Sequence, residues 1–112
     1  MFGTIARLHL KPGMEGKMLE LSRDFESAEV DGYVGQYIYR SEGNSNEYYL
    51  VALFRDRESY MANAESPEQD RRYRQLAELL AEEPEWHDGE IVYSATYEAD
   101  VDPIYGEIWK AA

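Results

Sequence analysis

Two side chains in this sequence have the type and spacing that could support acid–base or anion chemistry: Tyr60 and Arg74. The guanidinium of an arginine stays protonated at any working pH and donates two parallel hydrogen bonds, which suits an enolate or carboxylate oxygen. A tyrosine hydroxyl can orient such a ligand or give it a proton. Both residues also have a purely structural interpretation. Tyr60 is one of ten tyrosines, and Arg74 can pair at helical spacing with Glu68, Asp70 or Glu78.

The two histidines are the side chains best suited to move protons near neutral pH. His9 alternates with Leu8 and Leu10 in a strand pattern, so we expect it to face away from the helices in a structural or interface role. His87 precedes Asp88 in a Pro-Glu-Trp-His-Asp-Gly stretch that is typical of a turn. No His-x-Glu or His-x-x-x-His spacing occurs, so we expect neither a metal site nor another cofactor.

The composition argues against several classes of protein. The 112 residues include no cysteine, which excludes a thiolate nucleophile, a zinc–thiolate site and a disulfide, and favours a reducing compartment. Acidic residues outnumber basic ones by 23 to 11, and the formal net charge of −12 repels phosphate backbones and anionic lipid. No Gly-x-Gly-x-x-Gly pattern follows a strand, and no apolar run approaches the length of a membrane span. We expect a cytoplasmic protein that binds neither nucleic acid nor membranes.

The elements that must position these side chains follow from the apolar spacing. Residues 2–10 are rich in β-formers and end at a Lys-Pro-Gly turn. Residues 14–29 carry apolar side chains three and four positions apart, which predicts a helix. Residues 33–41 and 48–55 flank a polar loop and predict an antiparallel hairpin.

Two capping residues divide the second half of the chain. Asp56 is a candidate N-cap for a short helix that extends to about residue 65. Ser66, followed by proline and by glutamine three positions later, predicts a second helix to about residue 83, which Pro84 ends. Residues 90–98 are rich in β-formers and predict the fourth strand.

This order of elements predicts a ferredoxin-like β-α-β-β-α-β domain of the α+β class over residues 1–98. Its four-stranded antiparallel sheet carries the helices on one face, so the other face should alternate polar residues if it meets water. Both faces of the predicted strands are apolar instead, and soluble monomers do not tolerate so large an exposed patch. We therefore expect a homodimer formed through the open face of the sheet, with residues 99–112 packed on the partner.

Three segments resemble the antibiotic biosynthesis monooxygenase family: the KPGME turn, the stretch YYLVALFRDRESYMANAESPE, and residues 73–80 followed by PEW. The similarity covers about residues 2–98 and implies a dimeric α+β barrel. Members of this family include cofactor-free oxygenases of polyketide anthrones and quinols, haem-degrading enzymes and an isomerase. The haem-degrading branch fits poorly, because it places a histidine on the helix over residues 68–83, where this chain has none.

The anthrone-type oxygenases match best, because they place an aromatic residue at the end of a strand, a tyrosine on the next helix and an arginine on the helix after it. Phe54, Tyr60 and Arg74 stand at the corresponding positions. The resemblance implies a pocket between sheet and helices in which Arg74 holds an oxyanion and Tyr60 orients or protonates the substrate. The expected wall of this pocket consists of Thr4, Ala6, Phe25, Leu50, Ala52 and Phe54.

Two functions remain open at this level. The first is a cofactor-independent monooxygenase that acts on a small aromatic or quinone-like metabolite. The alternative is a non-catalytic dimeric module that binds a small ligand or only assembles. Phe54 and Leu50 favour the alternative, since the oxygenases carry tryptophan and asparagine at these positions, while the spacing of Tyr60 and Arg74 favours the enzyme.

Overall fold

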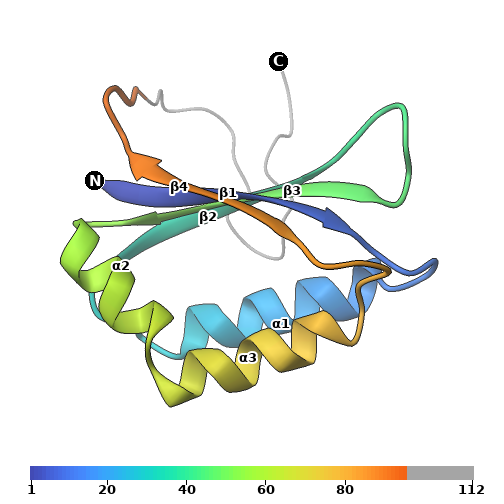
Figure 1. Cartoon of the computed structure of the whole chain (residues 1–112), viewed down its shortest axis with the longest axis horizontal. Coiled ribbons are helices and arrows are strands. Elements are labelled where there is room, and N and C mark those ends of the chain that lie inside the picture. Colours follow the sequence, from blue (N-terminus) through green and yellow to red (C-terminus); the bar gives the residue numbers. More distant parts are fainter. Residues whose placement is uncertain (96–112) are drawn as a thin grey trace.

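In the described part of the chain, the helices cover one face of the sheet and leave the other open, as the computed structural model shows (Figure 1). The structure describes residues 1–95. Its strands lie in the order β2-β3-β1-β4 and pair antiparallel, which confirms the predicted ferredoxin-like α+β fold. The elements are β1 (Phe2–His9), α1 (Glu15–Ser27), β2 (Tyr33–Arg40), β3 (Glu47–Phe54), α2 (Arg57–Ala64), α3 (Pro67–Ala77) and β4 (Glu85–Glu90).

Side-chain caps begin the two helices that follow β3, as predicted. The carboxylate of Asp56 accepts a hydrogen bond of 2.8 Å from the backbone N–H of Ser59. The hydroxyl of Ser66 accepts one of 3.1 Å from the N–H of Gln69. Each cap satisfies a backbone donor that has no partner inside its own helix. The hydrogen bonds from Ser59 lower the pKa of Asp56 to about 2.

The helix α3 ends at Ala77, before the predicted end at residue 83. The chain turns there, because Leu79 and Leu80 enter the core and their backbone joins the turn after β1. Lys11 N–H donates to the carbonyl of Leu79 at 2.8 Å, and Leu80 forms a bridge with Leu10. These tertiary contacts, and not Pro84, end the helix.

The prediction of the last strand was wrong in position. β4 covers Glu85–Glu90, the stretch that the sequence indicated to be a turn, and residues 91–95 carry no regular structure. The remainder of the predicted strand over 90–98, and the tail over 99–112, lie outside the described residues. Histidine, aspartate and glycine are poor strand formers, but the hydrogen bonds to β1 decide the conformation of this strand.

The hydrophobic core lies between the sheet and the helices. Its members include two side chains with no exposed surface, Ala6 and Leu8, and the nearly fully buried Met18 of α1. The hydroxyl of Tyr48 in this core donates a hydrogen bond of 2.6 Å to the carboxylate of Glu15. Within residues 1–95, no helix has the length and apolar character of a membrane-spanning segment.

Gly32, at the turn into β2, is expected to be intolerant of any side chain. Its φ of 78° lies in the left-handed region, and an added Cβ would lie 2.3 Å from the side chain of Ser59. We expect Gly32→Ala to lower the free energy of unfolding by about 1–3 kcal/mol. In the matched control Gly16→Ala, the new methyl group meets no atom within 4 Å and replaces a helical glycine, so it should raise that free energy by about 0.5–1 kcal/mol. Urea unfolding measures both changes, and equal stability of the two variants would contradict the expectation.

Candidate functional site

A cavity of about 410 Å³ lies between the sheet and the helices. Its volume falls in the range of pockets that hold small organic ligands. The sheet and all three helices contribute to its wall, which is mainly apolar and aromatic. The lining includes Thr4, Leu50, Ala52, Phe54 and Trp86 from the sheet, Phe25 from α1, Tyr60 and Asn63 from α2, and Gln69, Arg72, Tyr73 and Leu76 from α3.

The strand register sets which side chains meet at the floor of this cavity. Thr4 in β1 pairs with Ala52 in β3 and with Asp88 in β4, and Ala52 pairs with Gln36 in β2. Paired residues of antiparallel strands point to the same face. Gln36, Ala52, Thr4 and Asp88 therefore form one row across the sheet, on the face that the helices cover.

Most of the residues that the sequence suggested for the pocket line this cavity: Thr4, Phe25, Leu50, Ala52, Phe54 and Tyr60. Ala6 is fully buried in the core and is not part of the lining. Arg74 is also outside the lining. Its side chain is 77% exposed and its Nη2 atom lies 2.7 Å from Asp70 Oδ2, so the expected role of this arginine does not fit its position.

Arg72 lies at the cavity in place of Arg74. Its guanidinium carbon is 5.1 Å from the centre of the Phe25 ring, and its Nη1 donates a hydrogen bond of 3.2 Å to Gln69. Successive helical residues are 100° apart, so side chains at positions 72 and 74 point in nearly opposite directions. Because Tyr73 and Leu76 form the apolar stripe of α3, the helical spacing could have identified Arg72 as the inward arginine.

Tyr60 lies between two aromatic rings and contacts a carboxylate. Its ring centre is 5.2 Å from that of Phe2 and 5.5 Å from that of Phe54. Its hydroxyl donates a hydrogen bond of 2.8 Å to Asp88 Oδ1. Burial and this bond raise the pKa of Tyr60 to about 12. The nearby hydroxyl of Thr4 opposes this rise, although the two hydroxyls are not in hydrogen-bonding geometry. The side chain is therefore a neutral hydrogen-bond donor at physiological pH.

Thr4 has a buried hydroxyl whose hydrogen-bonding capacity is unused. The residue is only 4% exposed, and Oγ1 has no hydrogen-bond partner among the residues that the structure describes. Thr4 lines the cavity. An unsatisfied buried polar group costs free energy, so this hydroxyl is a point at which a polar atom of a ligand would be favourable.

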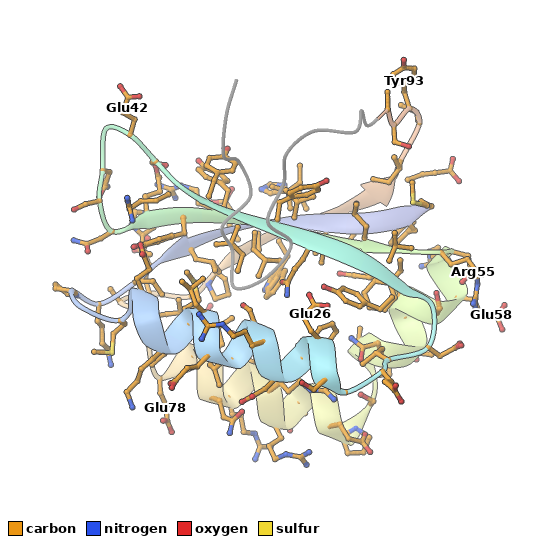
Figure 2. All side chains as sticks on the ribbon, turned by 180° about the vertical axis from the view of Figure 1, so that it is seen from behind. Glu26, Glu42, Arg55, Glu58, Glu78 and Tyr93 are labelled. Carbon is orange, nitrogen blue, oxygen red and sulfur yellow. The ribbon has the colours of Figure 1, made fainter. Side chains whose placement is uncertain are left out.

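Near β2, the polar side chains at the cavity already have hydrogen-bond partners. Glu26 of α1 (Figure 2) accepts hydrogen bonds from the Tyr33 hydroxyl at 2.5 Å and from Gln36 Nε2 at 3.2 Å. Burial and Glu26 raise the pKa of Tyr33, which keeps its hydroxyl neutral. This group fixes α1 against β2.

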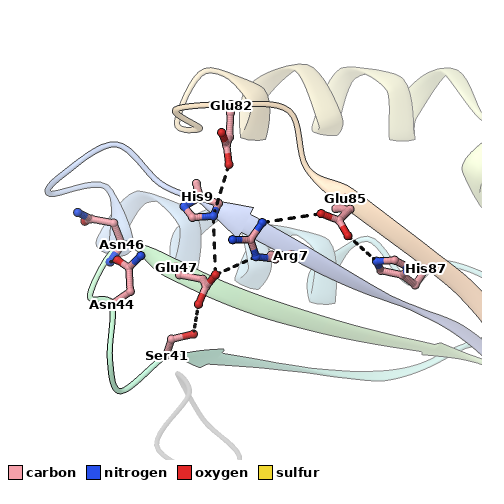
Figure 3. A network of polar contacts seen from close by, with 9 residues as sticks. All are labelled: Arg7, His9, Ser41, Asn44, Asn46, Glu47, Glu82, Glu85 and His87. Atoms are coloured by element: carbon pink, nitrogen blue, oxygen red, sulfur yellow. Dashed lines mark hydrogen bonds and ion pairs between the residues drawn. The ribbon is translucent and has the colours of Figure 1, made fainter.

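A separate polar network lies on the opposite face of the sheet (Figure 3). Arg7 Nε donates to Glu47 Oε2 at 2.8 Å, and His9 Nε2 lies 3.7 Å from the same oxygen and 3.4 Å from Glu82 Oε1. Hydrogen bonds from Ser41 and Arg7 lower the pKa of Glu47. His9 thus points away from the helices, as expected.

His87 is not in a turn, contrary to the prediction, but in β4 opposite Ile5, with its Nε2 atom 3.0 Å from Glu85 Oε1. It therefore lies on the open face, away from the cavity. Within residues 1–95, no group of three or more metal-binding side chains is arranged to hold a metal ion.

Between these polar residues, the open face of the sheet is apolar. Ile5, Tyr37 and Tyr39 are 47%, 54% and 55% exposed. The ring of Tyr39 stacks on that of Tyr49 with 5.3 Å between centroids. The apolar character predicted for this face is therefore present in the fold.

The family model for antibiotic biosynthesis monooxygenases matches residues 1–74. No curated protein matches the sequence. Many solved structures share the fold, although the sequence identity to those compared below is low.

A variant of SnoaB, a cofactor-independent oxygenase from Streptomyces nogalater, has a TM-score of 0.69 and 15% identity; the match covers 83% of this chain and 94% of that one. Rv0793 from Mycobacterium tuberculosis has a TM-score of 0.67 and 21% identity, with 85% and 98% covered. A conserved protein from Methanosarcina mazei has a TM-score of 0.68 and 18% identity, with 79% and 89% covered. At these identities the likeness supports the fold alone.

Proposed function

Because this chain belongs to the antibiotic biosynthesis monooxygenase family, we propose that it is a cofactor-independent monooxygenase. Its substrate would be a small aromatic or quinone-like metabolite bound in the cavity between sheet and helices. One observation supports this proposal most strongly. A neutral hydrogen-bond donor, Tyr60, and a permanent cation, Arg72, both lie in the wall of the same mainly apolar cavity.

The reaction consistent with these groups converts an activated methylene into a carbonyl. The enol tautomer of the substrate first loses its hydroxyl proton to give an enolate, which passes an electron to dioxygen. Carbon–oxygen bond formation and loss of water then give the carbonyl. One oxygen atom enters the product and the other leaves as water. The guanidinium of Arg72 would stabilise the enolate oxygen, and the apolar wall would strengthen this interaction by excluding water. The hydroxyl of Tyr60 would orient the substrate.

The same proposal includes a homodimer formed through the open face of the sheet. Ile5, Tyr37 and Tyr39 would be covered by the partner, which removes an exposed apolar patch. The polar network around Glu47 and Arg7 borders this patch and would form part of the polar rim of the interface.

A non-catalytic ligand-binding module of the same fold is the second candidate. The observation that favours it is the apolar wall at Leu50 and Phe54, both of which line the cavity. Neither side chain can hydrogen-bond a substrate oxygen. A ligand would then be held by shape and by Arg72 without being oxidised.

Oxygen uptake with 1,8-dihydroxyanthrone as substrate separates the two functions. We expect uptake above the buffer rate, and we expect Tyr60→Phe to lower kcat/KM about 10- to 100-fold, because the variant loses the hydroxyl that orients the substrate. The matched control is Tyr93→Phe, which removes a hydroxyl from a side chain that is 80% exposed and should leave kcat/KM unchanged. Quenching of the tryptophan fluorescence, to which Trp86 in the cavity wall contributes, reports binding. Binding without oxygen uptake would favour the ligand-binding module.

A further inference from the structure

Three side chains form a line from the interior of the cavity to the solvent at the edge of the sheet. Thr4 is buried, Tyr60 is half-buried, and Asp88 is exposed on β4. Thr4 and Asp88 are register partners, and the Tyr60 hydroxyl donates a hydrogen bond of 2.8 Å to Asp88 Oδ1. The line connects a cavity-lining hydroxyl to a carboxylate that water can reach.

We propose that Asp88 is the terminal acceptor of the substrate's proton and that Tyr60 passes this proton on, while Thr4 holds the substrate oxygen next to Tyr60. This inference rests on the proposed function and assigns the base that the oxidation needs. It also defines the substrate class further, as an aromatic compound that carries a phenolic or enolic hydroxyl.

The transfer conserves protons and charge. The O–H bond of the substrate enol breaks, and its proton forms a new bond to Oη of Tyr60 while the original phenolic proton of Tyr60 moves to Asp88 Oδ1. Tyr60 ends the step neutral, as it began. The substrate becomes an enolate beside Arg72, and the protonated Asp88 releases its proton to water.

The other candidate bases have different positions or partners. Asp70 lines the cavity but forms an ion pair with Arg74 at 2.7 Å. Glu26 already accepts two hydrogen bonds. His9 lies on the opposite face of the sheet, in contact with Glu47 and Glu82.

The unused hydroxyl of Thr4 is the second, independent observation. Oγ1 is buried at the cavity wall without a hydrogen-bond partner among residues 1–95. A substrate oxygen placed between Thr4 and Tyr60 would accept from one hydroxyl and donate to the other. The hydroxyls of Thr4 and Tyr60 would then both have hydrogen-bond partners. The substrate proton would point at Tyr60, whose hydroxyl contacts the carboxylate of Asp88.

Anaerobic stopped-flow absorbance with 1,8-dihydroxyanthrone tests this inference, because it follows enolate formation without the oxygen step. We expect Asp88→Asn to slow enolate formation about 10- to 100-fold. The asparagine keeps an oxygen that can accept the Tyr60 hydrogen bond but cannot take the proton, so a merely positioning role would leave the rate unchanged. The matched control is Glu90→Gln, the same change at an exposed residue two positions along β4.

Further variants keep the experiment decisive. Combining Asp88→Asn with Tyr60→Phe should be no slower than the slower single variant, because both act on one route. Thr4→Val should weaken anthrone binding, measured by fluorescence. If Asp88→Asn binds anthrone and forms the enolate at the parent rate, or if Asp70→Asn alone slows it, the assignment of Asp88 is overturned while the proposed function stands. If the parent protein does not bind anthrone, both fail.

Discussion

Replacing Arg72 with alanine is expected to lower kcat/KM for anthrone oxidation about 100-fold, whereas the matched Arg74→Ala change should leave it within about twofold. Both substitutions remove one positive charge from the same helix, two residues apart. Only Arg72 lies at the cavity, where its charge can act on an enolate oxygen with little screening. Arg74 is exposed and pairs with Asp70, and an exposed pair on a helix contributes little.

The comparison of these two arginines is made by steady-state oxygen uptake, with circular dichroism to show that both variants fold. Anthrone binding, measured by fluorescence, separates a weaker complex from slower chemistry. A larger loss for Arg74→Ala than for Arg72→Ala would contradict the geometry of α3. If both substitutions changed kcat/KM equally and only slightly, the guanidinium of Arg72 would have no role in the reaction.

The second large effect is expected at the open face of the sheet. Ile5→Lys should raise the dissociation constant of the homodimer at least 100-fold, because an unpaired ammonium group would be buried in the apolar centre of the interface. Ile5 is 47% exposed in the single chain and pairs with Val51 and His87, so we expect the fold of the monomer to tolerate the substitution. Sedimentation velocity over a range of concentrations measures the change.

The control for the interface is Gln75→Lys, which adds the same charge on the exposed side of α3. Its dissociation constant should equal that of the parent. A parent protein that sediments as a monomer at micromolar concentration would contradict the dimer. A dimer that Ile5→Lys leaves intact would place the interface on another surface.

The parts of the fold that the sequence predicted are those with a strong local signal. The change from strand to helical spacing after the Lys-Pro-Gly turn, and the caps at Asp56 and Ser66, gave the order of the elements. The fourth strand lacked such a signal. Residues 85–90 include histidine, aspartate and glycine, and they form a strand because β1 offers them hydrogen bonds, which is a tertiary effect.

In the candidate site too, the residues that depend on tertiary contacts could not be predicted from the sequence. Thr4, Ala52 and Phe54 could be assigned to the pocket because strand alternation places them on the helix-covered face. Asp88 could not be found, since the sequence indicated that it lay in a turn and its contact with Tyr60 joins residues 28 positions apart. The assignment of Arg74 followed a family resemblance, whereas the helical angle, had it been considered, would have indicated Arg72.

The position of β4 links ligand binding to local stability. This strand forms its backbone ladder with β1 alone in the described part of the chain, yet it carries Trp86 in the cavity wall and Asp88 beside Tyr60. A strand held from one side opens more readily than the strands inside a sheet. A bound molecule that contacts Trp86 would stabilise β4 against local opening. Ligand binding in the cavity should therefore slow amide hydrogen exchange in β4 much more than in β3.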